Sequence, residues 1–513
     1  MIRFWSLESD PAGQGRLSGA KPVAVLDIGS NSVRLVVYER LTRALTVLYN
    51  EKSSSTLGRG VAATGRLAET SMASALKAIR RFALVCRLTE VGDIYAIATS
   101  ATREAENGPE FARAVEDIIG VPVRVLSGVE EAHYAALGLV SGMPGFMGVV
   151  GDLGGGSLEL AMVDGGHDTG GETHELGVIR LQDDTQMTPS KASGIINERL
   201  KASKLLERGK YRSFAAIGGT WRALAKLHQA RCSYPLHMVQ DYVVRAADIL
   251  PLCDALIEGN GDRKLVKGIE TVSGSRKELL PYGAAVLAEV LRTGEFDEVV
   301  FSAQGVREGY LYDRLADDDK GIDPLLQAAE EISTLRSRAP EFSGDLIDGS
   351  GALFNLIGVE ETTDEERLRK AACYISDIGW RAHPDYRGEQ SIQMVAFSDI
   401  VGISHAGRAF LAQTLAFRYM GFKQKSTNAK LLELAGKDLS PRARLIAAYF
   451  RVAYPLAAAM PGILPRTRFS VDGKILELHL PSDLAFLDGD RMRGRQRQLA
   501  TEAGFKDGTI RVD

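Results

Sequence analysis

The stretches DIGSNS at residues 27–32 and DLGGGS at residues 152–157 decide the fold. Each follows a run of small and branched apolar residues and precedes an alternating strand pattern, and the two agree at the Asp, the first Gly and the last Ser. A strand, a tight turn and a second strand predict a β-hairpin at each stretch. A supersecondary unit that occurs twice predicts two similar α/β lobes, and ligands usually bind in a cleft between lobes.

Outward from these hairpins, the pattern alternates strands and helices as far as the acidic stretch LADDDKGID at 315–323. From 324 to about 450 helical periodicity prevails, and RFSVDGKILELHLP at 468–481 predicts a hairpin around Asp472-Gly473. We therefore expect the following domains: a disordered lead-in at 1–20, a first lobe at 21–140, a second lobe at 141–316, a helical domain at 317–450 and a small α+β domain at 451–513.

Composition narrows the class of protein. A chain of 513 residues is too long for one core, and no apolar run reaches the roughly 18 residues of a membrane span. The first twenty residues do not read as a signal peptide, and four scattered cysteines without CxxC spacing argue against a zinc or disulfide framework, so we expect a cytoplasmic protein without a membrane partner. The net charge of −4 argues against a general nucleic-acid binder.

A basic run near the end of the chain differs from this acidic balance. It consists of Arg491, Arg493, Arg495 and Arg497. Such a run is either a solvated surface or a contact strip for a long polyanion.

Three glycine-rich turns have the chemistry of a phosphate site. Glycine lets the backbone approach an anion, and exposed N–H groups at such a turn bind phosphate oxygens, although a hairpin turn with a locally satisfied Asp has the same pattern. The expected phosphate-binding residues are Asp27, Gly29, Ser30, Asn31, Ser32, Gly154, Gly155, Gly156, Ser157, Gly218, Gly219 and Thr220. In the third turn Thr220 also suits a plain helix N-cap.

Acidic side chains near these turns are candidates for metal binding and catalysis. We expect Asp27 to hold Mg²⁺ or another divalent cation, since carboxylate oxygens are its usual protein ligands. Glu159 is expected to face the same cleft as Asp152, and the family resemblance described below implies that Asp152 and Glu159 bind the metal as well. Glu130 is the expected general base, although the spacing Ser127-x-x-Glu130 is also that of a helix capping box. Arg103, after a buried strand, suits a phosphate clamp or a surface salt bridge.

The motifs together resemble the exopolyphosphatase / guanosine pentaphosphate phosphatase family, which has the actin-like, ribonuclease H-like fold. The resemblance rests on DIGSNS, ATSATREA (98–105), LSGVEEA (126–132), GDLGGGSLEL (151–160), GVIRL (177–181), AIGGT (216–220) and FSAQGVREGYL (301–311). It implies two actin-like lobes, a helical HD-like domain and a small α+β domain. The usual second motif has Thr where this chain has Leu158, which we expect to point away from the site.

The resemblance also implies roles. It makes Glu130 and Arg103 catalytic, and it implies release of orthophosphate from the end of inorganic polyphosphate with Mg²⁺. Guanosine pentaphosphate (pppGpp) is the alternative substrate, and a non-catalytic alarmone- or nucleotide-sensing module is the alternative of another class. Family members of this size imply a homodimer. In the helical domain Ser376 precedes Asp377 where a metal-binding His-Asp pair is needed, so we expect no separate metal site there.

Overall fold

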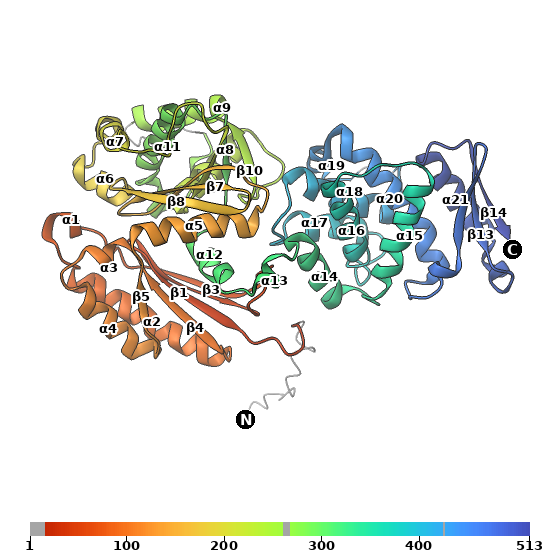
Figure 1. Cartoon of the computed structure of the whole chain (residues 1–513), viewed down its shortest axis with the longest axis horizontal. Helices are drawn as coiled ribbons and strands as arrows, with labels where there is room; N and C mark the ends of the chain where they lie inside the picture. Colours follow the sequence, from red (N-terminus) through yellow and green to blue (C-terminus); the bar gives the residue numbers. More distant parts are fainter. Residues whose placement is uncertain (1–15, 260–266, 424–425) are drawn as a thin grey trace. The chain divides into compact units, whose positions relative to one another are not determined.

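The computed structural model describes residues 16–259, 267–423 and 426–513, so most of the expected lead-in at 1–20 lies outside the described residues. The chain divides into two compact units, and the division falls between Ile322 and Asp323 (Figure 1). The first unit holds both repeated hairpins, and the second holds the helical segment and the C-terminal sheet.

Lobe I of the first unit is built on a five-stranded sheet in the order β3-β2-β1-β4-β5. Its strands are β1 (Val23–Ile28), β2 (Ser32–Tyr38), β3 (Val47–Ser54), β4 (Asp93–Ala98) and β5 (Val123–Val125). β1 and β2 form the predicted antiparallel hairpin, and β4 runs parallel to β1. Helices α2 (Glu69–Leu88) and α4 (Gly108–Ile119) contribute Ile79, Phe82 and Phe111 to the lobe's apolar core.

Lobe II has a six-stranded sheet in the order β10-β11-β9-β6-β7-β8. Its strands are β6 (Gly148–Leu153), β7 (Leu158–Asp164), β8 (His167–His174), β9 (Ser213–Ile217), β10 (Tyr242–Arg245) and β11 (Glu298–Phe301). Its helices include α6 (Val178–Asp184), α7 (Ala192–Leu200), α8 (Gly219–Arg231), α9 (Ala246–Glu258) and α11 (Leu280–Gly294). The second predicted hairpin is β6–β7. Leu158 is fully buried in this lobe's core, so the unusual residue of the motif has a packing role.

Two helices exchange lobes. Helix α5 (Gly128–Gly142) follows the last strand of lobe I, yet its apolar side chains share a core with β6 and β7 of lobe II. Helix α12 (Val306–Asp313) follows the last strand of lobe II, yet Tyr310 and Leu311 share a core with β1 of lobe I. The pair lies between the two sheets (Figure 1). The lobe boundary expected at residue 140 thus falls inside a helix.

Close approach of α5 and α12 depends on glycine. A Cβ atom at Gly138 would overlap the Gly305 carbonyl, and one at Gly309 would overlap the Tyr134 carbonyl. Because any larger residue would push the helices apart, these two glycines fix the contact that joins the lobes.

The second unit is mainly helical. Its long helices are α14 (Pro324–Arg336), α15 (Phe342–Leu356), α16 (Thr363–Ile375), α17 (Arg387–Ala396), α18 (His405–Met420) and α20 (Gly436–Ala457). The predicted C-terminal hairpin is present as β12 (Arg468–Asp472) and β13 (Ile475–Leu480), with Gly473 at φ +59° in the turn. Helix α21 (Asp490–Glu502) then leads to β14 (Asp507–Val512), which pairs parallel to β13.

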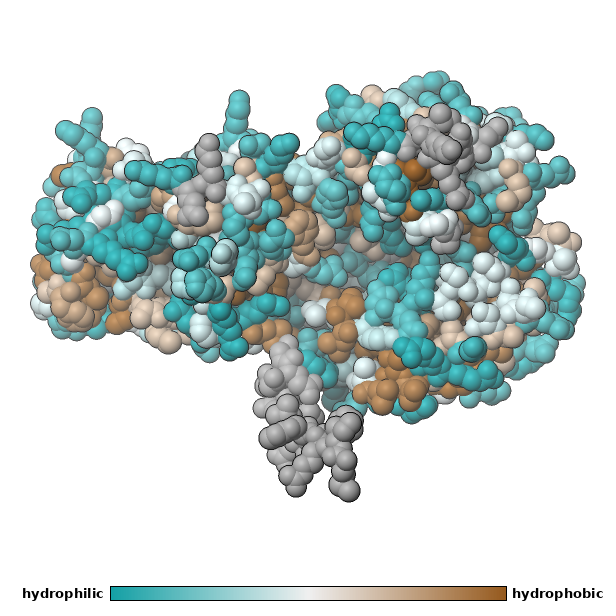
Figure 2. Space-filling model, turned by 180° about the vertical axis from the view of Figure 1, so that it is seen from behind, coloured by the Kyte–Doolittle hydropathy of each residue, from teal (hydrophilic) through white to brown (hydrophobic). Residues whose placement is uncertain are grey.

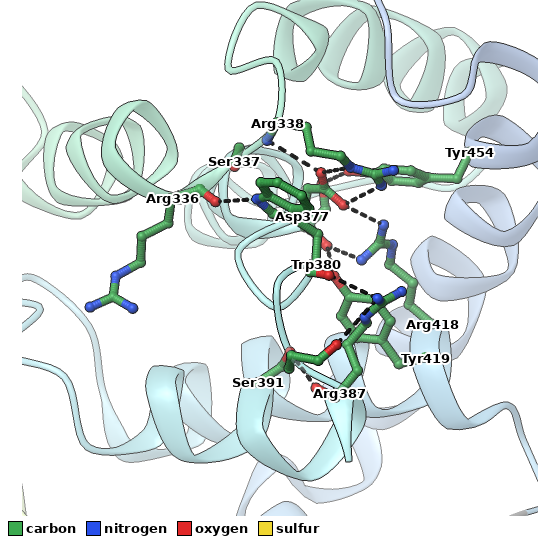
Figure 3. A network of polar contacts seen from close by, with 12 residues as sticks. Arg336, Ser337, Arg338, Asp377, Trp380, Arg387, Ser391, Arg418, Tyr419 and Tyr454 are labelled. Carbon is green, nitrogen blue, oxygen red and sulfur yellow. Dashed lines mark hydrogen bonds and ion pairs between the residues drawn. The ribbon is translucent and has the colours of Figure 1, made fainter. Parts of the chain in front are cut away.

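A buried ion network fastens the helices of this unit (Figure 3). The Asp377 carboxylate accepts two hydrogen bonds of 2.8 Å from the Arg338 guanidinium and one of 3.0 Å from Arg418 Nη2. The Arg418 guanidinium lies 3.7 Å from the centre of the Tyr454 ring, and Trp380 Nε1 donates to the Arg336 carbonyl at 2.8 Å. Asp377 is therefore engaged by two arginines.

Over the described residues, no helix is both long and apolar enough to cross a membrane. The face in Figure 2 is mostly hydrophilic, and its hydrophobic residues form separate patches.

Candidate active site

A cleft of about 200 Å³ lies between lobes I and II, and the three predicted glycine turns line it. The predicted residues that line it are Asp27, Gly29, Ser30, Asn31, Ser32, Asp152, Gly154, Gly155, Ser157, Glu159, Gly218, Gly219 and Thr220. Turns that are far apart in the sequence therefore meet at one place. Gly156 lies beside the cleft and lines a smaller neighbouring cavity.

The two repeated turns have the same geometry. The Gly29 N–H donates to the Ser32 carbonyl at 3.1 Å, and the Gly154 N–H donates to the Ser157 carbonyl at 3.0 Å. The turns also approach each other, because a Cβ atom at Gly155 would lie 2.9 Å from Ser30 Cβ. Larger residues would push the lobes apart at the base of the cleft.

The third turn begins helix α8. Gly218 has φ +111°, a conformation open mainly to glycine, and Gly219 lies under the Arg276 guanidinium, which a Cβ atom there would overlap. A helix N-terminus with a guanidinium above it favours an anion.

Asp152 and Glu159 are directly opposite each other on β6 and β7; Glu159 is buried, and Asp152 is partly exposed to the cleft. Burial raises the pKa of Asp152 to about 6 against the opposing charge of Arg222, and Asp27 raises it further. Burial and the neighbouring Glu131 raise the pKa of Glu159 well above its usual range. Its Oε1 has no hydrogen-bond partner among the described residues. Two opposing carboxylates, one of them buried with an unpartnered oxygen, fit a hard divalent cation.

Asp27, the third predicted metal ligand, is partly engaged. Its Oδ2 accepts a hydrogen bond of 2.9 Å from Arg307 Nη1. Within the described ranges, no group of three or more His, Cys, Asp or Glu side chains is arranged to hold a metal ion. A cation here would therefore rely on Asp152 and Glu159 with water or substrate oxygens, as Mg²⁺ sites often do.

Glu130 is not in the cleft, and the placement predicted for it is wrong. Its carboxylate accepts from the Ser127 backbone N–H at 2.8 Å and from Arg124 Nη2 at 2.6 Å, which completes the capping box of α5. The backbone bond of Ser127 and the pairing with Arg124 hold the pKa of Glu130 at about 2. The next residue, Glu131, lines the cleft instead and is buried.

Glu131 differs from Glu130 in its surroundings and in the direction of its pKa shift. Burial raises its pKa to about 7, against the lowering effect of the Arg103 guanidinium. Consecutive helical residues point about 100° apart, so the two glutamates face different surroundings. The capping-box spacing around Ser127 was the signal that could have separated them.

Arg103 does not line the cleft. Its Nη1 pairs with the Glu131 carboxylate and donates to the Leu126 carbonyl at 2.6 Å. Arg103 is therefore not placed as the predicted phosphate clamp, because its guanidinium is paired with Glu131. Arg103 is placed to hold the Glu131 carboxylate in position and to favour its charged form.

Sequence reasoning missed the cations of the cleft, which are Arg34, Lys52, Arg222, Arg276 and Arg307. They come from distant segments, and the repeat gives a signal for Arg34 alone. Asp27 faces Arg34 across the β1–β2 hairpin, as Asp152 faces Glu159 in the second copy.

Lys52 extends this row of side chains, since it is opposite Arg34 on β3. Burial, together with the charges of Arg276 and Arg34, lowers the pKa of Lys52 to about 8. Like charges that are directly opposite each other are destabilising, so this row favours a bound anion.

The profile described as "Ppx/GppA phosphatase family" matches residues 36–318 of the chain. The chain belongs to this family. A second profile, "Exopolyphosphatase, C-terminal", matches residues 325–510 of this family member. The resemblance predicted from the motifs is thereby confirmed.

Known relatives agree with this family. Exopolyphosphatase 2 of Mycobacterium tuberculosis is 28% identical over 311 residues, which are 56% of this chain and 96% of that protein. A guanosine-5'-triphosphate,3'-diphosphate pyrophosphatase of Vibrio campbellii is 24% identical over 423 residues, which cover 78% of this family member and 81% of that protein.

Solved structures agree with an actin-like α/β fold for the first unit. An exopolyphosphatase-like protein is 25% identical with a TM-score of 0.50, and the match covers 57% of this chain and 98% of that one. An exopolyphosphatase from Cytophaga hutchinsonii is 21% identical with a TM-score of 0.51, covers 59% of this chain and 99% of its own, and supports the fold alone.

Proposed function

We propose that the chain is an exopolyphosphatase that removes terminal orthophosphate from inorganic polyphosphate, with Glu131 as the general base. The observation that supports this most is the composition of the cleft. Two matched glycine turns and five cationic side chains surround a pocket in which one carboxylate, Glu131, has a pKa of about 7. Phosphoryl transfer needs positioning and neutralisation of charge more than covalent chemistry, and this cleft offers both.

In this proposal the terminal phosphate lies against the turns at Ser30 and at Gly154 and Gly155, whose backbone can approach it closely. Arg34, Lys52 and Arg276 face the following phosphates and offset their charge. Glu131 accepts a proton from the attacking water, and Arg103 keeps that carboxylate in place and lowers its pKa toward neutrality. A base with a pKa near the working pH is best suited to this step.

Asp152 and Glu159 would hold the divalent cation, for which carboxylate oxygens are suited. When bound, Mg²⁺ supplies positive charge to the phosphate oxygens. Asp27 would act indirectly, by holding Arg307 in position, since Arg307 Nη1 donates a hydrogen bond of 2.9 Å to Asp27 Oδ2.

The alternative substrate is pppGpp, and the Vibrio campbellii relative, whose match extends into the second unit, favours it. Release of orthophosphate from long-chain polyphosphate and from pppGpp at matched concentrations decides between them. We expect a higher kcat/KM on polyphosphate, whereas a much higher value on the nucleotide would reverse the choice.

The alternative of another class is a non-catalytic sensing module that keeps the fold. Binding of either ligand without release of orthophosphate, with Mg²⁺ present, would favour it. We also propose that the helical part is HD-like without a metal site of its own, since Asp377 is engaged by Arg338 and Arg418.

A further inference from the structure

A second, smaller cavity lies behind the base of the cleft. It has a volume of about 20 Å³ and shares Ser30, Ser100 and Gly155 with the cleft as lining residues. This volume holds one water molecule and not a phosphate ion. The cavity and the cleft therefore lie on opposite sides of a wall that these three residues form.

The wall is thin because its residues are small. Ser30 Oγ and Ser100 Oγ, both of lobe I, are 2.9 Å apart and hydrogen bonded. From lobe II, Gly155 and Gly156 complete the wall, and a Cβ atom at Gly156 would lie 2.8 Å from Ser100 Oγ. A small separation of the lobes at this point would join the cavity to the cleft.

An ion pair between the lobes is part of the lining of the cavity. Arg180 on α6 of lobe II pairs with Glu104 on α3 (Ser100–Glu104) of lobe I. Arg180 Nε also donates to the Gly156 carbonyl at 2.9 Å, and its side chain is only 13% exposed. Its guanidinium therefore lies next to the turn that we propose to hold the terminal phosphate.

We propose that orthophosphate leaves through this passage, with the Glu104–Arg180 pair as its gate. The inference rests on the proposed function. After hydrolysis, the product lies at the base of the cleft while the shortened polymer fills the way to the mouth. An exit behind the product lets the polymer stay bound for the next turnover.

The chemistry of Arg180 suits such a gate. A leaving phosphate can replace the Glu104 carboxylate at the guanidinium, since both are oxyanions that arginine binds through paired hydrogen bonds. Release then breaks the pair with Glu104 while a pair with phosphate forms, and Arg180 keeps Glu175 as a second partner at 3.6 Å. Product release limits the rate of many enzymes, so this gate would affect turnover.

The test separates formation of orthophosphate, by rapid quench, from its appearance in solution, by a fluorescent phosphate sensor. Ala62 is exposed on α1 (Val61–Thr64) and lines the outer side of the cavity. Ala62→Phe should fill the passage, delay release severalfold behind formation on long-chain polyphosphate, and leave the quench rate unchanged. The delay should be smaller on tripolyphosphate, whose pyrophosphate product can vacate the mouth. Ala62→Ser is the control of matched position.

Glu104→Gln tests the gate itself and leaves the bond from Arg180 to Gly156 in place. We expect faster release than in the unaltered chain, and an unchanged rate of release would exclude the Glu104–Arg180 pair as the gate. Glu106→Gln is its control, because Glu106 pairs with Arg66 inside lobe I at 3.3 Å.

The proposed exit is wrong if orthophosphate from Ala62→Phe appears in solution without delay after its formation. It is also wrong if formation and release are slowed equally. If the unaltered chain forms no orthophosphate, the proposed function itself fails, which is a different result.

Discussion

Adjacent glutamates at the start of α5 differ completely in their surroundings. Glu131→Gln keeps the size of the side chain but cannot accept a proton, so we expect kcat on polyphosphate to fall by about 10²-fold or more. Glu130→Gln is the matched control and should keep its activity, with a loss of about 1 kcal/mol in stability from the weakened helix cap. Steady-state kinetics and thermal unfolding of both variants check this. Loss of activity in the Glu130 variant alone would contradict the assignment.

The pKa of Glu131 also sets a pH dependence. Because burial raises this pKa to about 7, the carboxylate is protonated below pH 7, and kcat/KM should rise with pH through about 7. Arg103 opposes that rise in pKa, so Arg103→Met should move the acid limb to higher pH, while Arg103→Lys should retain most of the original profile. A pH–rate profile at constant ionic strength measures this, and an unmoved limb in Arg103→Met would exclude the positioning role.

Strands β1, β2 and β3 together place Asp27, Arg34 and Lys52 in one row across the sheet. Since burial and neighbouring arginines lower the pKa of Lys52 to about 8, its positive charge is lost as the pH rises above 8. We therefore expect kcat/KM on polyphosphate to decline above pH 8 and Lys52→Arg to remove that decline, because arginine stays charged. A decline that persists in Lys52→Arg would mean that another group titrates.

Helices of the second unit depend on the network around Asp377. Removing this carboxylate leaves Arg418 buried without its partner, so Asp377→Ala should lower the free energy of unfolding by about 3–5 kcal/mol. Asp364→Ala removes an exposed carboxylate that pairs with Arg367 at 2.8 Å, and it should cost less than about 1 kcal/mol. Urea denaturation followed by circular dichroism compares the two, and equal losses would contradict a special role of Asp377.

The elements that sequence reasoning predicted are those with a strong local pattern. Both glycine-turn hairpins and the Asp472-Gly473 hairpin follow from apolar alternation and turn residues. The exchange of α5 and α12 between lobes could not be predicted, because each helix has an apolar face that fits either sheet. The cations of the cleft were missed for a different reason, since only the folded chain brings Lys52 and Arg276 together.

At the scale of the molecule, every residue that lines the cleft lies within the first unit, Ser18–Ile322. The Mycobacterium tuberculosis relative matches 56% of this chain over 96% of its own length, so a chain of this extent exists without the remainder. We expect a fragment of residues 18–322 to fold and to hydrolyse tripolyphosphate with the kcat/KM of the full chain. The same fragment with Glu131→Gln is the control, and a folded but inactive fragment would show that the second unit is needed.

Asp27 is opposite Arg34 in one hairpin, and Asp152 is opposite Glu159 in the other. The two copies of the repeated unit therefore differ in charge. Linear polyphosphate has no direction, because its two termini are chemically identical. On the proposed function, direction has to be supplied by the protein, and the difference between Arg34 and Glu159 at matching positions of the two hairpins would supply it: the first hairpin has a cation for the incoming chain, and the second has two carboxylates. A repeated fold with unequal charge would then give a polymer with identical ends a defined first bond.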